Sequence, residues 1–175
     1  MQEVSVVIPN FNGMAYLDGV LSSLERQTIR NFEVILVDNG STDGSCAFVS
    51  AEYPWVHMIQ LPENYGFSRA VNEGIRAARS PYVLLLNNDT EAEPDFLEEM
   101  VAALRRHKKA FSCQAKMIQL HDRDKMDDAG NYYCALGWAF ARGKGKDIRH
   151  YDREQKIFST CAGAAIYRKK FIDQD

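Results

Sequence analysis

Two aspartates that follow buried, β-branched stretches are the residues of this chain best suited to ligand chemistry. Asp38 follows the run Glu33–Val37, and Asp89 follows the run Tyr82–Leu86 after two asparagines. A carboxylate beside a hydrophobic core is unfavourable unless it pairs with something. Asp38 can accept the imide N–H of a uracil or thymine, or a ribose hydroxyl. Asp89 is a hard oxygen ligand of the kind that holds Mg²⁺ or Mn²⁺ against a diphosphate.

Polar and glycine-containing clusters follow four apolar runs. They read Pro9-Asn10-Phe11-Asn12-Gly13, Asp38-Asn39-Gly40-Ser41-Thr42-Asp43-Gly44, Asn64-Tyr65-Gly66-Phe67 and Asn87-Asn88-Asp89. Within them Phe11 offers a flat face to a base, Gly66 lets a ligand approach the backbone closely, and Asn88 can bond ribose or phosphate. Each cluster alone is also explained as a turn or a helix cap, because Asn, Asp and Gly favour both. Turns do not require carboxylates at the ends of two buried strands, so the clusters together favour a binding site.

The elements that must position these clusters alternate strands with amphipathic helices. We expect strands over Val4–Ile8, Glu33–Val37, His57–Leu61 and Tyr82–Leu86. The apolar stripes of three helices between and after them are Met14, Leu17, Leu21 and Leu24; Phe67, Ala70, Val71, Gly74 and Ala78; and Leu97, Met100, Val101 and Leu104. One more helix is expected to begin at Thr42 or Asp43, and Pro94 is expected in the first turn of the last one. Repeated units of this kind predict a mostly parallel α/β sheet flanked by helices, which binds ligands at the carboxyl edge of its strands.

The pattern loosens after residue 110. Phe111–Ile118 and Asn131–Arg142 predict strands of a mixed or antiparallel extension, and Ile157–Arg168 is a further apolar stretch. Arg142–Lys146 is typical of an exposed, mobile loop. We expect one domain in two parts, residues 1–110 with the ligand clusters and residues 111–175.

Composition excludes several classes of protein. The formal net charge of −3 argues against a nucleic-acid partner, which would call for a basic face. No apolar run approaches the roughly 20 residues of a membrane span, and no signal peptide is visible. The four cysteines are scattered without ligand spacing, so we expect buried, free thiols and a cytoplasmic protein.

The order and spacing of the clusters resemble the family-2 glycosyltransferases of the GT-A fold. The matching segments are Val6–Gly13, Val37–Ser45, Asn64–Phe67 with Asn72 and Gly74, and Leu84–Thr90, which corresponds to the family's DXD segment. The resemblance is closest to the bacterial branch that includes rhamnosyltransferases and other cell-surface polysaccharide enzymes. Segments similar to that branch are Asp128-Ala129-Gly130, Leu136-Gly137-Trp138 and Cys161–Ala165.

This resemblance implies a sugar-transfer reaction. The donor would be a nucleoside-diphosphate sugar, with UDP or dTDP favoured, and the acceptor a hydroxyl of a saccharide or of a lipid-linked molecule at the inner face of the membrane. Transfer would be inverting, dependent on Mg²⁺ or Mn²⁺, and part of polysaccharide synthesis. The donor-binding residues carried over are Pro9, Phe11, Asn12, Asp38, Asn64, Gly66, Asn88, Asp89, Gly163 and Ala164, with Asp89 as the metal ligand.

The chain departs from the family pattern in two places. The DXD segment reads Asn-Asn-Asp, so the metal would depend on oxygens of the diphosphate. The family's catalytic base, an acid often in a Glu-Asp pair, lies downstream of the segment that Cys161–Lys170 resembles. Asp173 and Asp175 are poor candidates because chain ends fray. We therefore expect the base beyond Asp175 and a truncated chain that is inactive by itself.

Three alternatives remain open on the sequence. Asp38 also occupies the place of a ribose-binding acid in a dinucleotide-dependent dehydrogenase, but the first turn lacks the glycine-rich fingerprint of that class. A sugar nucleotidyltransferase would need a glycine-rich, basic first loop, which is absent as well. The third alternative is a non-catalytic module that binds a nucleotide or a partner protein.

Overall fold

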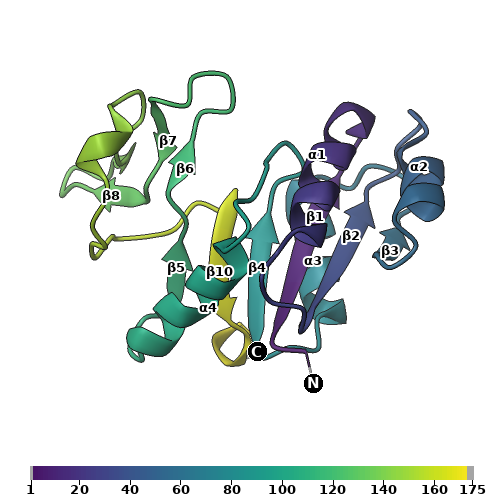
Figure 1. Ribbon diagram of the computed structural model, residues 1–175, viewed down its shortest axis with the longest axis horizontal. Coiled ribbons are helices and arrows are strands. Elements are labelled where there is room, and N and C mark those ends of the chain that lie inside the picture. Colours follow the sequence, from purple (N-terminus) through teal and green to yellow (C-terminus); the bar gives the residue numbers. More distant parts are fainter. Residues whose placement is uncertain (1, 173–175) are drawn as a thin grey trace.

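A six-stranded sheet forms the centre of the computed structural model, which describes residues 2–172. Asp173 and Asp175 lie outside the described residues. The strand order is β3-β2-β1-β4-β10-β5 (Figure 1). The first four strands along the chain run parallel, and β10 is antiparallel to both of its neighbours. The predicted α/β sheet with a mixed extension is therefore confirmed.

The strands of this sheet agree closely with the expected ones in its first half. Their bounds are β1 Val4–Asn10, β2 Phe32–Asp38, β3 His57–Gln60, β4 Tyr82–Leu86, β5 Ser112–Gln114 and β10 Ala164–Arg168. Short runs rich in Val, Ile and Leu suit strands that are covered on both faces. The apolar stretch Ile157–Arg168 becomes a strand only from Ala164 onward.

Helices cover both faces of the sheet. The helices α1 (Met14–Glu25), α2 (Ser45–Glu52) and α4 (Phe96–Arg106) pack on one face, where they share a core with alternate residues of β1. The helix α3 (Phe67–Ala77) covers the other face, against residues such as Val7. The alternation of side chains along each strand supplies both cores, and the result is a three-layer sandwich.

Two helices begin later than expected. The carboxylate of Asp43 accepts hydrogen bonds from the backbone N–H of Ser45 (3.1 Å) and of Met14 (2.9 Å), so it precedes α2 and satisfies the start of two helices. Pro94 precedes α4, and its carbonyl accepts a bond from Thr28 N–H. The expected burial of Met14 and Phe67 was wrong, since they are 38% and 53% exposed. Each of the two is the first residue of its helix.

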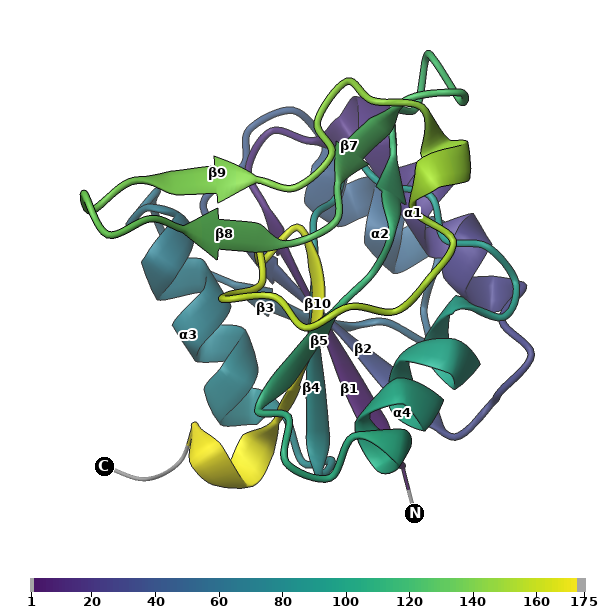
Figure 2. The same ribbon diagram turned by 90° about the vertical axis from the view of Figure 1, so that its left-hand side faces the viewer.

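The second half of the chain adds two small sheets at the β5 end of the molecule, far from β3 (Figures 1 and 2). Their strands are β6 Met117–Ile118 with β7 Met126–Asp128, and β8 Asn131–Tyr133 with β9 Ala139–Ala141. The stretch Phe111–Ile118 is thus divided between two sheets, and Asn131–Arg142 forms a hairpin. None of the helices among residues 2–172 has the length and apolar character needed to cross a bilayer.

The loop Arg142–Lys146 is anchored by its backbone. Arg142 N–H donates to Gly130 O, while Met126 exchanges backbone bonds with both Gly145 and Lys146. The Arg142 guanidinium lies 4.9 Å from the centre of the Tyr151 ring. Lys144, Gly145 and Lys146 are exposed, as expected, while the backbone of the turn is paired with β7.

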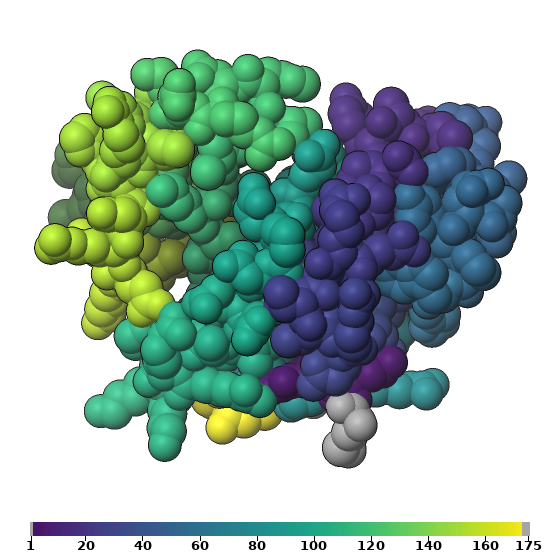
Figure 3. All heavy atoms as spheres, viewed as in Figure 1, coloured from purple at the N-terminus to yellow at the C-terminus, as the bar shows by residue number. Residues whose placement is uncertain are grey.

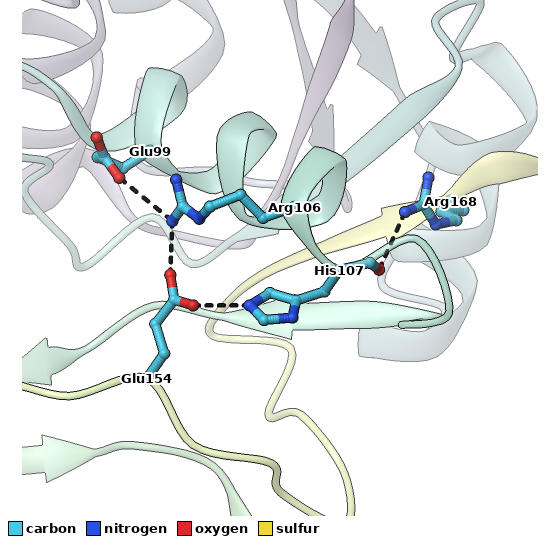
Figure 4. Close-up of polar contacts among 5 residues, drawn as sticks. All are labelled: Glu99, Arg106, His107, Glu154 and Arg168. Carbon is cyan, nitrogen blue, oxygen red and sulfur yellow. Dashed lines mark hydrogen bonds and ion pairs between the residues drawn. The ribbon is translucent and has the colours of Figure 1, made fainter.

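Residues 151–162, which we term the strap, are fastened to the end of α4 by ion pairs (Figure 4). The Glu154 carboxylate accepts bonds from Arg106 (2.5 Å) and His107 (2.7 Å). The bond from His107 has the larger effect and that from Arg106 the next, and together they hold the pKa of Glu154 below its ordinary value. Arg168 of β10 donates to the carbonyls of Leu104 and His107, so it ties the sheet to the same helix end.

The four cysteines are free, as expected, but their predicted burial was wrong. Cys161 is exposed, and Cys46, Cys113 and Cys134 are half-buried.

Candidate functional site

The ends of β1, β2 and β4 are joined by one side chain, that of Asn10, which is only 2% exposed. Asn10 lies opposite Asp38 in the register of β1 with β2. Its Nδ2 donates to Asp38 Oδ1 (2.9 Å), and its Oδ1 accepts from Asn88 Nδ2 (2.8 Å). Asp38 and the Asn88-Asp89 pair therefore share one rim, as the sequence predicts.

Asp38 is a buried anion at this rim. Its Oδ2 accepts a bond from Ser41 N–H (2.9 Å), and its side chain is 2% exposed. Burial acts to raise the pKa of this carboxyl, but hydrogen bonds from Ser41, Asn10 and Cys46 outweigh it and lower the pKa. Burial and the neighbouring Asp38 raise the pKa of the Cys46 thiol to about 11. At neutral pH Asp38 thus carries a negative charge beside a protonated Cys46 thiol.

The loop after β1 is clipped to the loop after β2. Asn12 adopts a left-handed φ of 49°. Its N–H donates to Ser41 Oγ (2.8 Å), and its Oδ1 accepts from Thr42 N–H (2.9 Å). With the Asn12 side chain engaged in this way, the neighbouring Phe11 ring remains 47% exposed, and Pro9 is half-buried.

The third cluster is fastened to β2 by Asn39, which is 4% exposed. Its Nδ2 donates to Asn64 Oδ1 (2.8 Å) and to the carbonyl of Gly66 (3.2 Å), and its Oδ1 accepts from Tyr65 N–H. Gly66 has a φ of +85°, a backbone conformation that disfavours any residue with a side chain. A Cβ at this position would nevertheless meet no atom within 4 Å. The surface beside Gly66 is therefore open to a ligand.

Gly163 and Ala164 lie beside the end of β4. Asn87 N–H donates to the carbonyl of Gly163 (2.9 Å), and Ala164 pairs with Leu86 in the sheet. Asp89 projects from this place and is exposed. The structure therefore brings all ten predicted binding residues to one edge of the sheet, in two groups that meet at Asn10 and Asn88.

Sequence reasoning missed Asn10 and Asn39 as organising residues. Both lie in polar clusters that were identified from the sequence, but only neighbouring residues in those clusters were predicted to bind the ligand. A usable signal was their position directly after buried strand residues, where an amide must find partners.

A cleft of about 650 Å³ opens on the far side of Asp89. It lies between the start of α4 and the segment of β6 and β7, where Figure 3 shows a hollow in the surface. Asp89 and Ala164 line it, whereas Phe11, Asp38 and Gly66 do not. Its other acidic residues are Glu91, Glu93, Asp95, Glu99, Asp122 and Asp127. Asp89 thus stands between the rim and the cleft.

The donor set at Asp89 fits a metal that takes most of its ligands from a substrate. Among the residues that the structure describes, no three His, Cys, Asp or Glu side chains are grouped to hold an ion. Glu91, two residues on, faces Arg123 at 3.4 Å. One exposed carboxylate with amide oxygens beside it suits Mg²⁺, which is commonly held by one or two carboxylates together with phosphates and water.

Comparison with known proteins assigns residues 5–174 to the family model described as glycosyl transferase family 2. The putative glycosyltransferase EpsH of Bacillus subtilis is 34% identical over 56% of this chain and 29% of its own length. The putative teichuronic acid biosynthesis glycosyltransferase TuaG of the same species is 29% identical over 71% of this chain and 50% of its own. The chain thus spans half or less of the length of these relatives.

Solved structures share the fold. The S. aureus TarS 1–349 structure in complex with UDP-GlcNAc has a TM-score of 0.71 and 22% identity, over 98% of this chain and 46% of TarS 1–349. The mannosyltransferase PcManGT from Pyrobaculum calidifontis, in complex with GDP-Man and Mn²⁺, has a TM-score of 0.67 and 17% identity, over 98% of this chain and 46% of its own.

Proposed function

Because the chain belongs to glycosyl transferase family 2, we propose that it binds the donor for transfer of a sugar from a nucleoside-diphosphate sugar to an acceptor hydroxyl. The observation that carries this proposal is the joining of three strand ends through Asn10, since it puts Asp38 and Asp89 on one rim. Ligands of parallel α/β sheets bind at such an edge.

The nucleotide would lie across the ends of β1, β2 and the loop before α3. The exposed Phe11 ring gives the base an apolar face, with Asn12 next to it and Pro9 near the end of β1. Asp38, whose carboxylate already accepts bonds from Asn10, Ser41 and Cys46, would take up a base N–H as a further partner. Asn64 and the open backbone of Gly66 border the other side. We favour a UDP- or dTDP-linked hexose or rhamnose, and the complexes of TarS with UDP-GlcNAc and of PcManGT with GDP-Man support a nucleoside-diphosphate sugar as the donor.

A divalent metal would be held by Asp89 and an amide oxygen beside it, together with the diphosphate. When bound, it neutralises the charge that develops on the leaving diphosphate. Gly163 and Ala164 would flank the sugar, because they pair with the end of β4 directly before Asp89.

The acceptor would enter the cleft beyond Asp89, so that its hydroxyl attacks the anomeric carbon from the side opposite the diphosphate and inverts it. Residues 111–175 supply one wall of this cleft. We assign the general base to none of residues 2–172. The name of the relative TuaG supports a role in cell-surface polysaccharide synthesis. We place that role in the cytoplasm, with a saccharide or lipid-linked acceptor met at the inner face of the membrane.

The melting temperature tests donor binding. UDP or dTDP with Mn²⁺ should raise it, because a ligand that binds only the folded state stabilises that state, and NAD should not. Asp89→Ala should abolish the part of the shift that requires Mn²⁺, and Glu52→Ala, an exposed acid of α2, serves as the matched control. In the full-length protein Asp89→Ala should also slow sugar transfer. Stabilisation by NAD alone, or transfer at the wild-type rate, would refute the proposal.

A further inference from the structure

The hydrogen-bond chain from Asp38 through Asn10 to Asn88 has a direction, and one charge sets it. An ionised carboxylate can only accept hydrogen bonds. Asn10 must therefore turn its Nδ2 toward Asp38 Oδ1, 2.9 Å away, because the flipped amide would place an oxygen against an oxygen. The pKa of Asp38, lowered by its hydrogen-bond donors against the effect of burial, keeps this charge in place.

The orientation of the Asn10 amide in turn fixes the orientation of the Asn88 amide, which follows β4. Once the Asn10 Nδ2 faces Asp38, only its Oδ1 can face Asn88, which must then donate through Nδ2 at 2.8 Å. The remaining atom, Asn88 Oδ1, accepts a hydrogen bond from no group among residues 2–172, and the Asn88 side chain is half-buried. The free end of Asn88 is thus an oxygen and not an NH₂ group.

Gly13 makes this close contact sterically possible. A Cβ at Gly13 would lie 2.2 Å from Asn88 Nδ2 and 2.3 Å from Asn10 Oδ1, which are the two atoms of the bond. The φ of Gly13 is −104°, so the backbone itself would tolerate a side chain. The glycine is therefore required by the Asn10–Asn88 bond and not by the turn.

We infer that Asn10 is a positioning residue that makes Asn88 present its amide oxygen to the ligand, so that this point of the rim receives a hydrogen-bond donor or a cation. The inference rests on the proposed function and narrows it. Asn88 meets a ribose hydroxyl or the divalent metal beside Asp89, and phosphate oxygens are held elsewhere. The buried charge of Asp38 thereby acts on the ligand through two amides.

A double-mutant cycle tests the chain of bonds. Asn10→Ala and Asn88→Ala should each weaken UDP binding in Mn²⁺ by about tenfold, measured by calorimetry, which corresponds to about 1.4 kcal/mol and is of the size of one hydrogen bond. The double variant should be no weaker than either single one, because both break the same link. A double variant weakened by about a hundredfold would mean independent effects and would overturn the inference. Asn31→Ala is the control, since that amide bonds Glu3 at the opposite edge.

Binding of separate ligands shows whether the Asn88 oxygen receives a ribose hydroxyl or the cation. If Asn88 receives a ribose hydroxyl, Asn88→Ala weakens uridine binding without metal. If Asn88 receives the cation, only UDP with Mn²⁺ is affected. Weaker binding of inorganic pyrophosphate without metal, with both other ligands unaffected, would show an NH₂ group facing phosphate and would contradict us.

A measurement without ligand separates this inference from the proposed function. In NMR spectra of the wild type, one side-chain Hδ2 of Asn88 should show the downfield shift of a hydrogen-bonded proton. In Asp38→Asn, where the new amide can donate as well as accept, that shift should move upfield. An unchanged Asn88 signal in Asp38→Asn would refute the inferred chain of hydrogen bonds, even if UDP binds. Absence of any UDP binding would refute the proposed function without contradicting the chain of hydrogen bonds.

Discussion

At the scale of single residues, Asp38 shows what sequence reasoning reaches and what it does not. Strand periodicity placed this acid at the correct rim, because the end of a parallel strand is a local property of the chain. Its burial among amides depends on Asn10, 28 residues away in the sequence, and no local pattern carries that information. For the same reason the sequence did not show that the Asn12 side chain is hydrogen-bonded to the loop after β2.

Asp38 should couple stability to pH. Its folded-state pKa lies below the ordinary value of 3.8, so its contribution is present above that value and is lost as the pH falls through the lowered pKa. Urea unfolding should show wild-type stability falling more steeply than that of Asp38→Asn from pH 5 toward pH 2. The exposed Asp152→Asn serves as the control. Parallel curves for the wild type and Asp38→Asn would refute the assignment of a lowered pKa.

Cys46 should be the slowest cysteine to alkylate. Burial and Asp38 raise the pKa of its thiol to about 11, so little thiolate exists at pH 8, whereas Cys161 is exposed. Iodoacetamide labelling followed by mass spectrometry should modify Cys161 first and Cys46 last. Modification of Cys46 at the rate of Cys161 would contradict the raised pKa.

At the scale of elements, long periodic stretches were predicted well and short ones were not. The strand β4 matched its expected bounds, α1 contained its expected stripe, and α3 contained its own except for Ala78, which follows the helix. The strands β6 to β9 have two or three residues each, too few to show a period, and they are held by pairing with one another. The start of α2 was predicted two or three residues too early, because Asp43 precedes the helix and accepts the Ser45 N–H.

The packing of α3 on β1 depends on Gly74. A Cβ there would lie 2.3 Å from Val7 Cγ1, so Gly74→Ala should lower the free energy of unfolding by about 1–3 kcal/mol through overpacking. Gly19→Ala in α1 is the matched control, because its Cβ would meet only Glu91 at 3.4 Å. That change should raise stability by roughly 0.5–1 kcal/mol through helix propensity. Denaturant unfolding that ranks the two variants in the opposite order would contradict this packing.

The strap should loosen when Glu154 loses its charge. Glu154→Gln removes the ion pairs with Arg106 and His107 that hold it to α4. Limited trypsin digestion should then cut after Arg153 and Lys156 sooner than in the wild type, while Glu52→Gln should behave as the wild type does. Equal cutting rates in Glu154→Gln and the wild type would show that other contacts hold the strap.

At the scale of the whole molecule, the rim and the cleft meet at Asp89. The rim gathers residues from the first half of the chain together with Gly163 and Ala164, and the cleft lies between the first half and the small sheets of the second. The sequence predicted the rim because each cluster follows a strand of one parallel sheet. It could not predict the cleft, since the cleft depends on where β6 and β7 lie relative to α4.

Paramagnetic Mn²⁺ tests the central claim most directly, because it broadens the NMR signals of nearby amides. Added with UDP, it should broaden those of Asn88, Asp89 and Gly163 and leave that of Trp55, which lies in a separate pocket with Glu25, unaffected. Broadening centred on Asp122 and Asp127 in the cleft, or none that depends on UDP, would contradict a donor site on the rim joined by Asn10.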